Sequence, residues 1–418
     1  MSFEYMLAER TARSGRASRA RIMMRIATVS TALGIAVMIV TLAVVSGFRH
    51  RIYGDLRGFG SDVRVCDVRV LRSGAGEPMP LSDSFLEQLR RCEGVAAAWP
   101  YAEAAGMAKN GEQVAGLGIK GVDGECDLEW WRSRLVAGEM PSIGGDARTK
   151  DLLISRATAS ALRLGVGDKV EMLFMDGEGR PRRDRFVVSG LYDTGFEELD
   201  RATALTDLRN VQRIASPDNG LISGYEIMAA RGADAADVAA AAEQAIETAF
   251  YAGDESVGSA AAVTLRERYP VVFDWLKTHD VNARVILAVM MAVVLFNMAS
   301  AMLIMVLDRT GMIGVLKAMG MRNGAVRRVF LYRAAMLFVR GAAWGNAVGL
   351  AIVGLQAWLH PVRLDPEGYM LSVLPVRVEV WWVVALNVGA VAVTVAVMTL
   401  PSMIVARISP EQTLKYRQ

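Results

Sequence analysis

Four long apolar stretches punctuate the chain, and each is long enough to cross a membrane as a helix. A spanning helix needs about 20 predominantly apolar residues. The stretches are residues 26–45, 285–307, 336–359 and 381–405. Arg340 is the only charged residue inside them, and we expect its side chain to reach the membrane surface or a partner. The pattern predicts an α-helical membrane protein with four transmembrane helices.

A cleaved signal peptide is the alternative interpretation of the first stretch. Signal peptides carry an apolar region of about 7–15 residues, followed by a small-residue cleavage site. Residues 26–45 are longer, follow a basic leader at 1–25 and precede no convincing cleavage site. We therefore assign residues 26–45 as the first membrane helix.

Residues 46–284 have a different pattern, in which short apolar runs alternate with amphipathic segments. Val63, Val65, Val68 and Val70 change phase after Cys66, which predicts a bulged strand over 63–70. Ser84 and Glu87 predict a capping box for a helix at 84–91. Further strands are predicted at 151–155, 169–174, 185–192 and 225–228, and helices at 157–164 and 234–250. The mixture indicates a large α/β domain inserted between helices 1 and 2, with two subdomains.

Charge distinguishes the two sides of this topology. The N-terminal segment 1–25 has a net charge of +4, the loop 308–335 has +5 and the tail 406–418 has +2. Residues 46–284 have a net charge of −8, and the short loop 360–380 is close to neutral. Positively charged short segments stay in the cytoplasm. We therefore expect both termini and the 308–335 loop to be cytoplasmic, and the α/β domain to lie outside.

The sequence contains few residues or motifs typical of catalysis. The chain lacks the G-x-x-x-x-G-K-[ST] phosphate loop and the G-x-S-x-G nucleophile motif. His50, His279 and His360 are isolated in sequence, so no metal site is expected. We interpret the carboxylates of Glu197, Glu198 and Asp200 as a solvated loop, in preference to a catalytic pair. We expect no cofactor, no nucleic-acid partner and no enzymatic activity.

Cys66, Cys92 and Cys126 all fall in the α/β domain. One pair could form a disulfide and leave an odd thiol, or all three could be buried thiols. The sequence leaves this disulfide state open.

Gly341, Gly345 and Gly349 recur every four residues in the third stretch. This spacing places three small residues on one helical face, where another helix can approach closely. We interpret them as helix-packing residues within the bundle or in a dimer.

The loop 308–335 contains a short amphipathic segment bounded by Gly311 and Gly320. Such a helix is suited to dock in a groove of a cytoplasmic partner. It could equally lie at the membrane interface. The residues alone do not decide between these two interpretations.

Several segments together resemble a known family, the four-helix FtsX-like and MacB-like permeases of ABC transporters. The resemblance lies in residues 30–48, 152–170, 186–200, 311–334 and 400–417. Within the family, the chain is most similar to the transmembrane subunits of lipoprotein-releasing systems, the LolC/LolE family. Two positions depart from the family pattern. Met312 stands where an acidic residue is common, and Met403 with Ile404 replaces an aromatic-Arg pair.

The resemblance implies a permease subunit of the bacterial inner membrane without its own ATPase domain. It would pair with a second permease, identical or paralogous, and with a dimer of a separate ABC ATPase. The segment bounded by Gly311 and Gly320 would be the coupling helix that contacts this ATPase. Its expected contact residues are Met312, Ile313, Val315, Leu316, Lys317 and Met319.

In the lipoprotein-releasing branch, the transporter passes lipoproteins from the membrane to a periplasmic chaperone. Helix depth suggests a substrate-cavity lining formed by Val44, Val45, Phe48, Leu287, Val289 and Met290. The alternatives are a related permease for efflux or peptide export and a membrane receptor unconnected to ATP. A cell-division permease is disfavoured because its external domain should be much smaller than 46–284.

Overall fold

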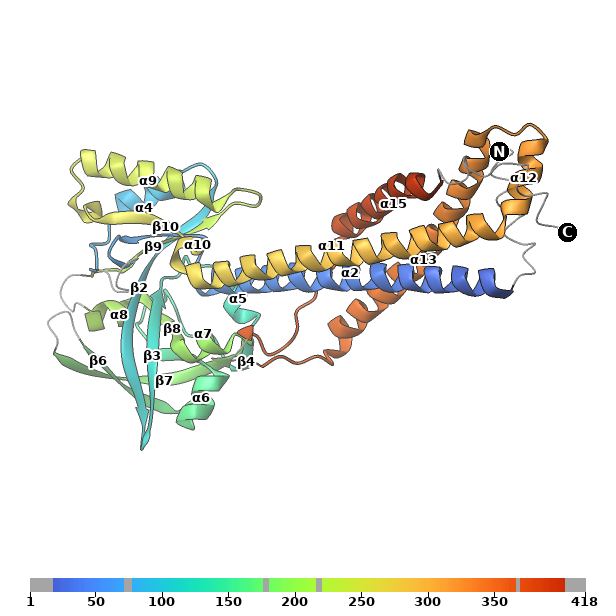
Figure 1. Cartoon of the computed structure of the whole chain (residues 1–418). Coiled ribbons are helices and arrows are strands. Elements are labelled where there is room, and N and C mark those ends of the chain that lie inside the picture. The colour runs from blue at the N-terminus through green and yellow to red at the C-terminus, as the bar shows by residue number, and fades with distance from the viewer. Residues whose placement is uncertain (1–17, 71–76, 176–179, 216–219, 366–368, 403–418) are drawn as a thin grey trace. The chain divides into compact units, whose positions relative to one another are not determined.

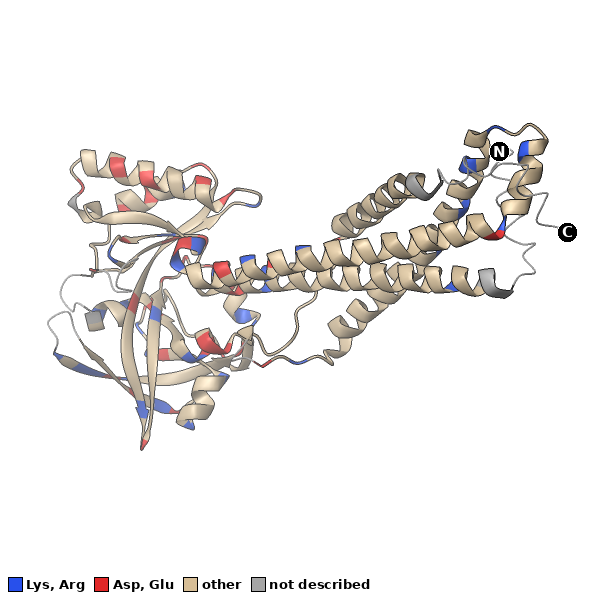
Figure 2. Cartoon of the chain, in the orientation of Figure 1, with Lys and Arg blue, Asp and Glu red and all other residues tan. Residues whose placement is uncertain are grey.

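Four long helices contain the apolar stretches in the computed structural model, the fourth stretch as far as residue 402 (Figure 1). The structure describes residues 18–70, 77–175, 180–215, 220–365 and 369–402. The four long helices are α2 (Ser18–Phe59), α11 (Pro270–Asp308), α13 (Asn323–Leu359) and α15 (Val380–Ser402). The short helix α12 (Thr310–Ala318) connects α11 and α13. All four long helices are apolar enough to cross a membrane. Figure 2 shows few charged residues along their middle parts.

The chain divides into two compact units, which we describe separately. The helical unit comprises residues 1–50, 275–362 and 374–418, and the α/β unit comprises 51–274 and 363–373. Helix α2 has 42 residues, so it is about 63 Å long, roughly twice the thickness of a membrane core. It continues beyond Val45 because Ile52, Leu56 and Phe59 keep a helical spacing and are buried in the α/β unit.

The α/β unit is built on one ten-stranded sheet. Its strands are β1 (Val63–Asp67), β2 (Val95–Asn110), β3 (Gln113–Val122), β4 (Leu135–Gly138), β5 (Asp151–Ser155), β6 (Lys169–Met175), β7 (Pro181–Tyr192), β8 (Thr203–Asp207), β9 (Gly224–Ala229) and β10 (Ala260–Thr264). Its helices are α4 (Asp83–Arg90), α5 (Glu129–Arg132), α6 (Arg156–Leu162), α7 (Glu197–Ala202), α8 (Leu208–Ala215), α9 (Ala235–Tyr251) and α10 (Leu265–Arg268).

The long strand β2 joins two parts of this sheet. Residues 95–101 of β2 pair with β9, and residues 106–109 pair with β6. The pairings β2–β3–β8–β5–β7–β6 return to β2 and close a ring of six strands, whereas β9, β1 and β10 extend the sheet from the other half of β2. One apolar cluster includes side chains from both parts, among them Val65, Phe174 and Phe186. The two parts of the sheet thus share a strand and a core within one compact unit, and the division into two subdomains stays a prediction.

The first predicted strand is shorter and more regular than expected. Strand β1 ends at Asp67 and pairs without a register shift to β9 on one side and β10 on the other. All five of its residues are buried, because β1 is an interior strand, and Val68 lies beyond it and is exposed. The apparent change of phase therefore marks the end of a strand buried on both faces, and no bulge is present.

The N-terminus of α4 is also displaced from its predicted position. The helix begins at Asp83, and the Ser82 hydroxyl accepts a hydrogen bond from the Phe85 amide at 3.3 Å. Ser82, two residues before the predicted cap, is therefore the N-cap. A complete capping box occurs instead at α10, where Thr264 and Glu267 satisfy each other's backbone amides.

Candidate functional site

Helix α12 is a single short helix held between two long ones. It ends because Gly320 adopts a φ of +87°, and the Met321 amide then donates to the Leu316 carbonyl at 3.0 Å. A side chain at position 320 would be strained in this left-handed conformation. The glycine thus terminates α12 and turns the chain toward α13.

The two faces of α12 have different surroundings. Val315 and Met319 are 56% and 79% exposed, and Gly311 and Ala318 are exposed beside them. Ile313 lies on the other face, is fully buried and belongs to the apolar core of the helical unit. Residues four apart share one face of a helix, so positions 311, 315 and 319 form a continuous exposed stripe.

This arrangement corrects part of the expected contact set. Ile313 packs against the chain's own helices because α12 folds back on the core, so it offers no surface to a partner. Met312 and Leu316 are half-buried at the edge of the stripe, and Lys317 is half-buried away from it. The sequence identified the amphipathic segment, but it did not show which apolar residues the bundle itself covers.

Basic residues lie in the chain segments on either side of α12. Arg322 and Arg328 are exposed just after α12, and Arg309 precedes it. In Figure 2, most of the charged positions at this end of the helical unit are coloured as Lys or Arg. An apolar surface with a basic rim can bind a groove that is apolar at its centre and acidic at its edge.

The glycine repeat of α13 faces α2. A Cβ added at Gly345 would lie 2.6 Å from the Ala32 carbonyl oxygen and 2.7 Å from the Ile35 Cβ. A Cβ added at Gly341 would lie 2.8 Å from the Thr31 Cβ, and one at Gly349 would lie 3.1 Å from the Ala36 Cα, both on α2. The structure therefore uses the repeat for packing within one chain, where the missing side chains let two backbones approach.

Hydrogen bonds between neutral side chains connect the long helices to one another. The side-chain amides of Asn346 and Asn387 donate to each other at 2.8 and 2.9 Å, which joins α13 to α15. Asn297 of α11 donates to the Ser30 hydroxyl of α2 at 2.5 Å. Because water is absent from a membrane core, such reciprocal pairs satisfy polar groups that would otherwise be unpaired.

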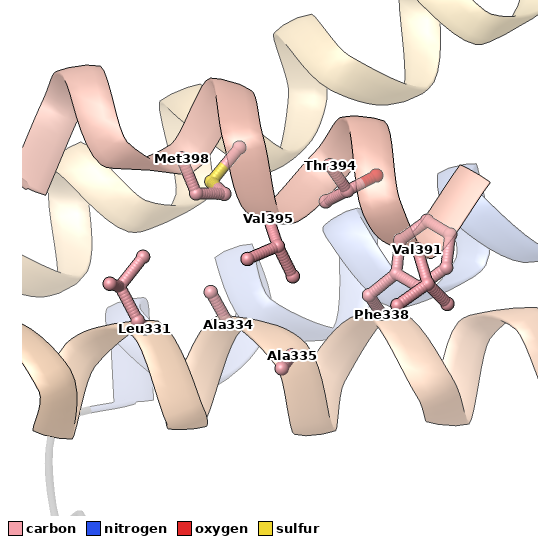
Figure 3. Close-up of a pocket in the computed structure, with 8 residues that line it drawn as sticks. All are labelled: Leu331, Ala334, Ala335, Phe338, Val391, Thr394, Val395 and Met398. Atoms are coloured by element: carbon pink, nitrogen blue, oxygen red, sulfur yellow. The ribbon is translucent and has the colours of Figure 1, made fainter. Parts of the chain in front are cut away.

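A small apolar pocket lies between α13 and α15 (Figure 3). Its lining comprises Leu331, Ala334, Ala335, Phe338, Val391, Thr394, Val395 and Met398. Thr394 provides the only hydroxyl in this lining, and its oxygen is buried without a hydrogen bond among the described residues. Nothing in the pocket is charged, so its lining offers no group for acid–base chemistry.

The residues suggested as a substrate-cavity lining do not meet in one cavity in this structure. Leu287 and Met290 pack against the core of the helical unit, and Val289 is 50% exposed. Phe48 packs against Trp275, with ring centroids 5.7 Å apart, and stacks on His279. Val44 and Val45 are half-buried on α2. Their cavity role stays a prediction for the assembled transporter.

The α/β unit contains a buried cluster of charges that sequence reasoning missed. Lys120, which is 4% exposed, donates to both oxygens of Glu226 at 2.7 and 2.8 Å and to the Phe59 carbonyl at 2.7 Å. Arg64 and the indole of Trp99 also donate to Glu226. These partners are far apart in sequence, so only the fold reveals the cluster. It is fully hydrogen-bonded, which indicates a structural role.

The acidic run after β7 is more ordered than the expected solvated loop. Glu197 begins helix α7, and the buried Asp200 accepts hydrogen bonds from the amide and hydroxyl of Thr194 at 3.1 and 2.7 Å. Burial raises the pKa of Asp200 to about 6. Asp200 therefore caps a turn, and Glu197 and Glu198 remain on the surface side of the helix.

The cysteines and histidines form no site within the described residues. Cys66, Cys92 and Cys126 are free thiols, and burial raises the pKa of the Cys126 thiol far above its ordinary value. A protonated, buried thiol is a poor nucleophile and a poor metal ligand. In the part of the chain that the structure describes, no three His, Cys, Asp or Glu residues are placed to hold a metal.

Comparisons with known proteins cover both units. Residues 26–246 match the MacB-like periplasmic core domain, and residues 284–410 match the FtsX-like permease C-terminal family. The chain is 25% identical over 410 residues to the "Lipoprotein-releasing system transmembrane protein LolC" of Xylella fastidiosa, with 92% of each chain covered. It is 23% identical over 408 residues to the protein of the same name from Neisseria meningitidis, again with 92% of each chain covered.

Among solved structures, the periplasmic region of MacB from Actinobacillus actinomycetemcomitans matches 52% of this chain and 95% of its own length. The identity is 11% and the TM-score is 0.34. The family matches include the segments at 30–48, 152–170, 186–200 and 311–334 on which the resemblance rested. Most of the tail segment 400–417, including Met403 and Ile404, lies outside the described residues. The chain belongs to the family of FtsX-like and MacB-like ABC transporter permeases.

Proposed function

We propose that this chain is the permease subunit of a transporter that releases lipoproteins from the bacterial inner membrane to a periplasmic chaperone. Relatives named as lipoprotein-releasing transmembrane proteins, aligned over 92% of both chains, support this substrate. ATP is hydrolysed by a separate ATPase dimer, and a second permease, identical or paralogous, completes the complex. The chain itself moves and binds, and performs no chemistry.

Both termini and α12 lie in the cytoplasm in this proposal, and the α/β unit lies in the periplasm between α2 and α11. The charge pattern supports this orientation, because the short segments at 1–25, 308–335 and 406–418 are all positive. The substrate-facing domain and the ATPase-facing helix then occupy opposite sides of the membrane.

The exposed stripe on α12 carries the proposed coupling to the ATPase. Val315 and Met319 are large apolar residues that the chain leaves uncovered at its cytoplasmic end. A helix that presents anchors four residues apart fits a groove in a partner. Met312 and Leu316 extend the contact at the edge of the stripe. Closure of the ATPase dimer would then displace α12, and α11 and α13 with it.

Val315→Asp tests this contact. A carboxylate placed at the centre of an apolar interface loses its water without gaining a partner, so we expect ATPase co-purification to fall roughly tenfold or more. Asn323→Asp is the matched control, since Asn323 is exposed at the start of α13 and outside the stripe. Both variants should insert into the membrane at normal levels. Normal ATPase recovery with Val315→Asp would rule out α12 as the contact.

The substrate is tested separately by depleting the chain in its own bacterium. We expect lipoproteins destined for the outer membrane to accumulate in the inner membrane, measured by membrane fractionation. Unaltered lipoprotein sorting together with intact ATPase binding would favour the alternative, a related permease for efflux or peptide export.

A further inference from the structure

A slot between α2 and the start of α15 is unused by the coupling proposed above. One wall of the slot comprises Ile39, Leu42, Ala43 and Ser46 of α2. The other wall comprises Arg377, Val378, Glu379, Trp382 and Val383. The slot is a shallow groove that is open to the surroundings. All these residues belong to the helical unit.

Backbone contacts hold the two walls together. The Arg377 amide donates to the Ala43 carbonyl at 2.9 Å. One turn further along α2, a Cβ on Gly47 would lie 2.4 Å from the Pro375 carbonyl oxygen, so only glycine allows this approach. The Ser46 hydroxyl donates to Glu379 Oε1 at 2.5 Å. The slot is therefore formed in the isolated chain and does not need a ligand to create it.

The lining has two chemically distinct zones. Ile39 and Ala43 are buried and make an apolar floor, together with Leu42 and Val383. Arg377 and Glu379 are exposed at the rim, immediately before the apolar helix α15 begins at Val380. Trp381 and Trp382 follow directly, and tryptophan is enriched where a membrane meets water. The charged rim therefore lies at the level of lipid headgroups.

The two rim charges retain binding capacity. Among the described residues, the Arg377 guanidinium makes no hydrogen bond or ion pair, and Glu379 has only Oε1 occupied, by Ser46. Arg49, another cation at this end of the bundle, is already paired with Asp280. The Arg377 guanidinium and Glu379 Oε2 are therefore available to a ligand, and they lie two residues apart beside an apolar surface. This arrangement complements a lipid that has a zwitterionic headgroup.

We propose that this slot binds a membrane phospholipid whose headgroup carries a phosphate and a primary ammonium, as in phosphatidylethanolamine. The phosphate binds the Arg377 guanidinium, the ammonium donates to Glu379 Oε2, and one acyl chain lies along the partly exposed side chains of Leu42 and Val383. Guanidinium suits phosphate because its N–H groups form paired hydrogen bonds. The assignment to the outer leaflet rests on the proposed orientation, but lipid binding itself does not.

Photo-crosslinking tests the proposal on the full chain in nanodiscs. The probe is phosphatidylethanolamine with a diazirine in one acyl chain, competed with unlabelled phosphatidylethanolamine, phosphatidylcholine or phosphatidylglycerol. We expect labelled peptides from 39–46 and 378–383. We also expect phosphatidylethanolamine to compete about fivefold better than the others, the factor for one exposed charge pair. Phosphatidylcholine has no N–H to donate, and phosphatidylglycerol has no cation.

The variants separate the headgroup from the acyl chain. Arg377→Gln and Glu379→Gln should each reduce labelling about fivefold, whereas Arg49→Gln, the matched control, should leave it unchanged. Equal competition by all three lipids would overturn the headgroup assignment and indicate an acyl chain held without selectivity. Loss of labelling when the ATPase and second permease are added would show that a protein occupies the slot. These crosslinking results do not depend on lipoprotein release, so the lipid-binding proposal and the proposed function can fail separately.

Discussion

The α/β unit buries full charges at its centre, whereas the helical unit places buried glycines and half-buried neutral amides between its helices. Glu226 is 1% exposed and accepts hydrogen bonds from Lys120, Arg64 and Trp99. In the helical unit, Gly345 is buried against α2, and the half-buried Asn346–Asn387 pair joins α13 to α15. The difference follows from the surroundings, because apolar burial holds the α/β core together in water but gives little drive between helices in lipid.

Substitution in the buried charge cluster around Glu226 should give the largest loss of stability. Glu226→Leu removes the shared acceptor and leaves Lys120 and Arg64 buried without a full counter-charge, so we expect a loss of about 3–5 kcal/mol in the α/β unit. Hydrogen exchange of β1 and β9 peptides would measure it. Glu103→Gln removes the exposed partner of Arg64 and should lose less than about 1 kcal/mol. Equal effects would show that burial does not set the strength of this network.

Substitution in the glycine repeat of α13 should give the next largest loss of stability. Gly345→Val forces a side chain against Ala32 and Ile35, and overpacking of this kind loses about 1–3 kcal/mol. The melting temperature in detergent measures the loss. Gly354→Val on the same helix is the control, since a Cβ there meets nothing within 4 Å. If both variants melt alike, the α2–α13 contact is not what holds these helices together.

A pH effect should be confined to the α/β unit. The pKa of Asp200 is about 6 in the folded chain and near 3.8 without burial, so the native state binds the proton more tightly. Stability from this group is fully present below about pH 4 and is lost as pH rises through 6, on the order of 1–2 kcal/mol. Asp200→Asn should flatten the pH dependence of hydrogen exchange around α7. An unchanged slope would assign the effect to Asp123, whose pKa burial also raises to about 6.

The amide pair should give the smallest effect. A double-mutant cycle with Asn346→Ala and Asn387→Ala isolates the coupling between α13 and α15, for which we expect about 0.6 kcal/mol. Unfolding in mixed detergent measures each variant. Strict additivity would mean that each amide is satisfied by its own helix, through the carbonyls of Ala342 and Val383.

The four long helices, the α/β class and several strands could be predicted from the sequence, because periodicity and apolar content are local properties. Strands 151–155 and 169–174 and the helix at 234–250 occur within one residue of their predicted limits. The helix ends were harder to predict. Helix α2 continues to Phe59, because beyond residue 45 the apolar residues lie on one face of the helix only. The continuous apolar run ends at residue 45, so the run alone did not indicate where the helix ends.

The sequence by itself determined the apolar helices, the charge asymmetry, the amphipathic segment between Gly311 and Gly320 and the glycine repeat, since each depends on composition or spacing within one segment. Tertiary structure decided which residues those elements meet. It buried Ile313 and exposed Val315, placed the glycines on α2, joined Lys120 to Glu226 across 106 positions, and brought Arg377 to Ala43. Contacts between distant segments depend on how faces pair in space, and neither local periodicity nor composition records that pairing.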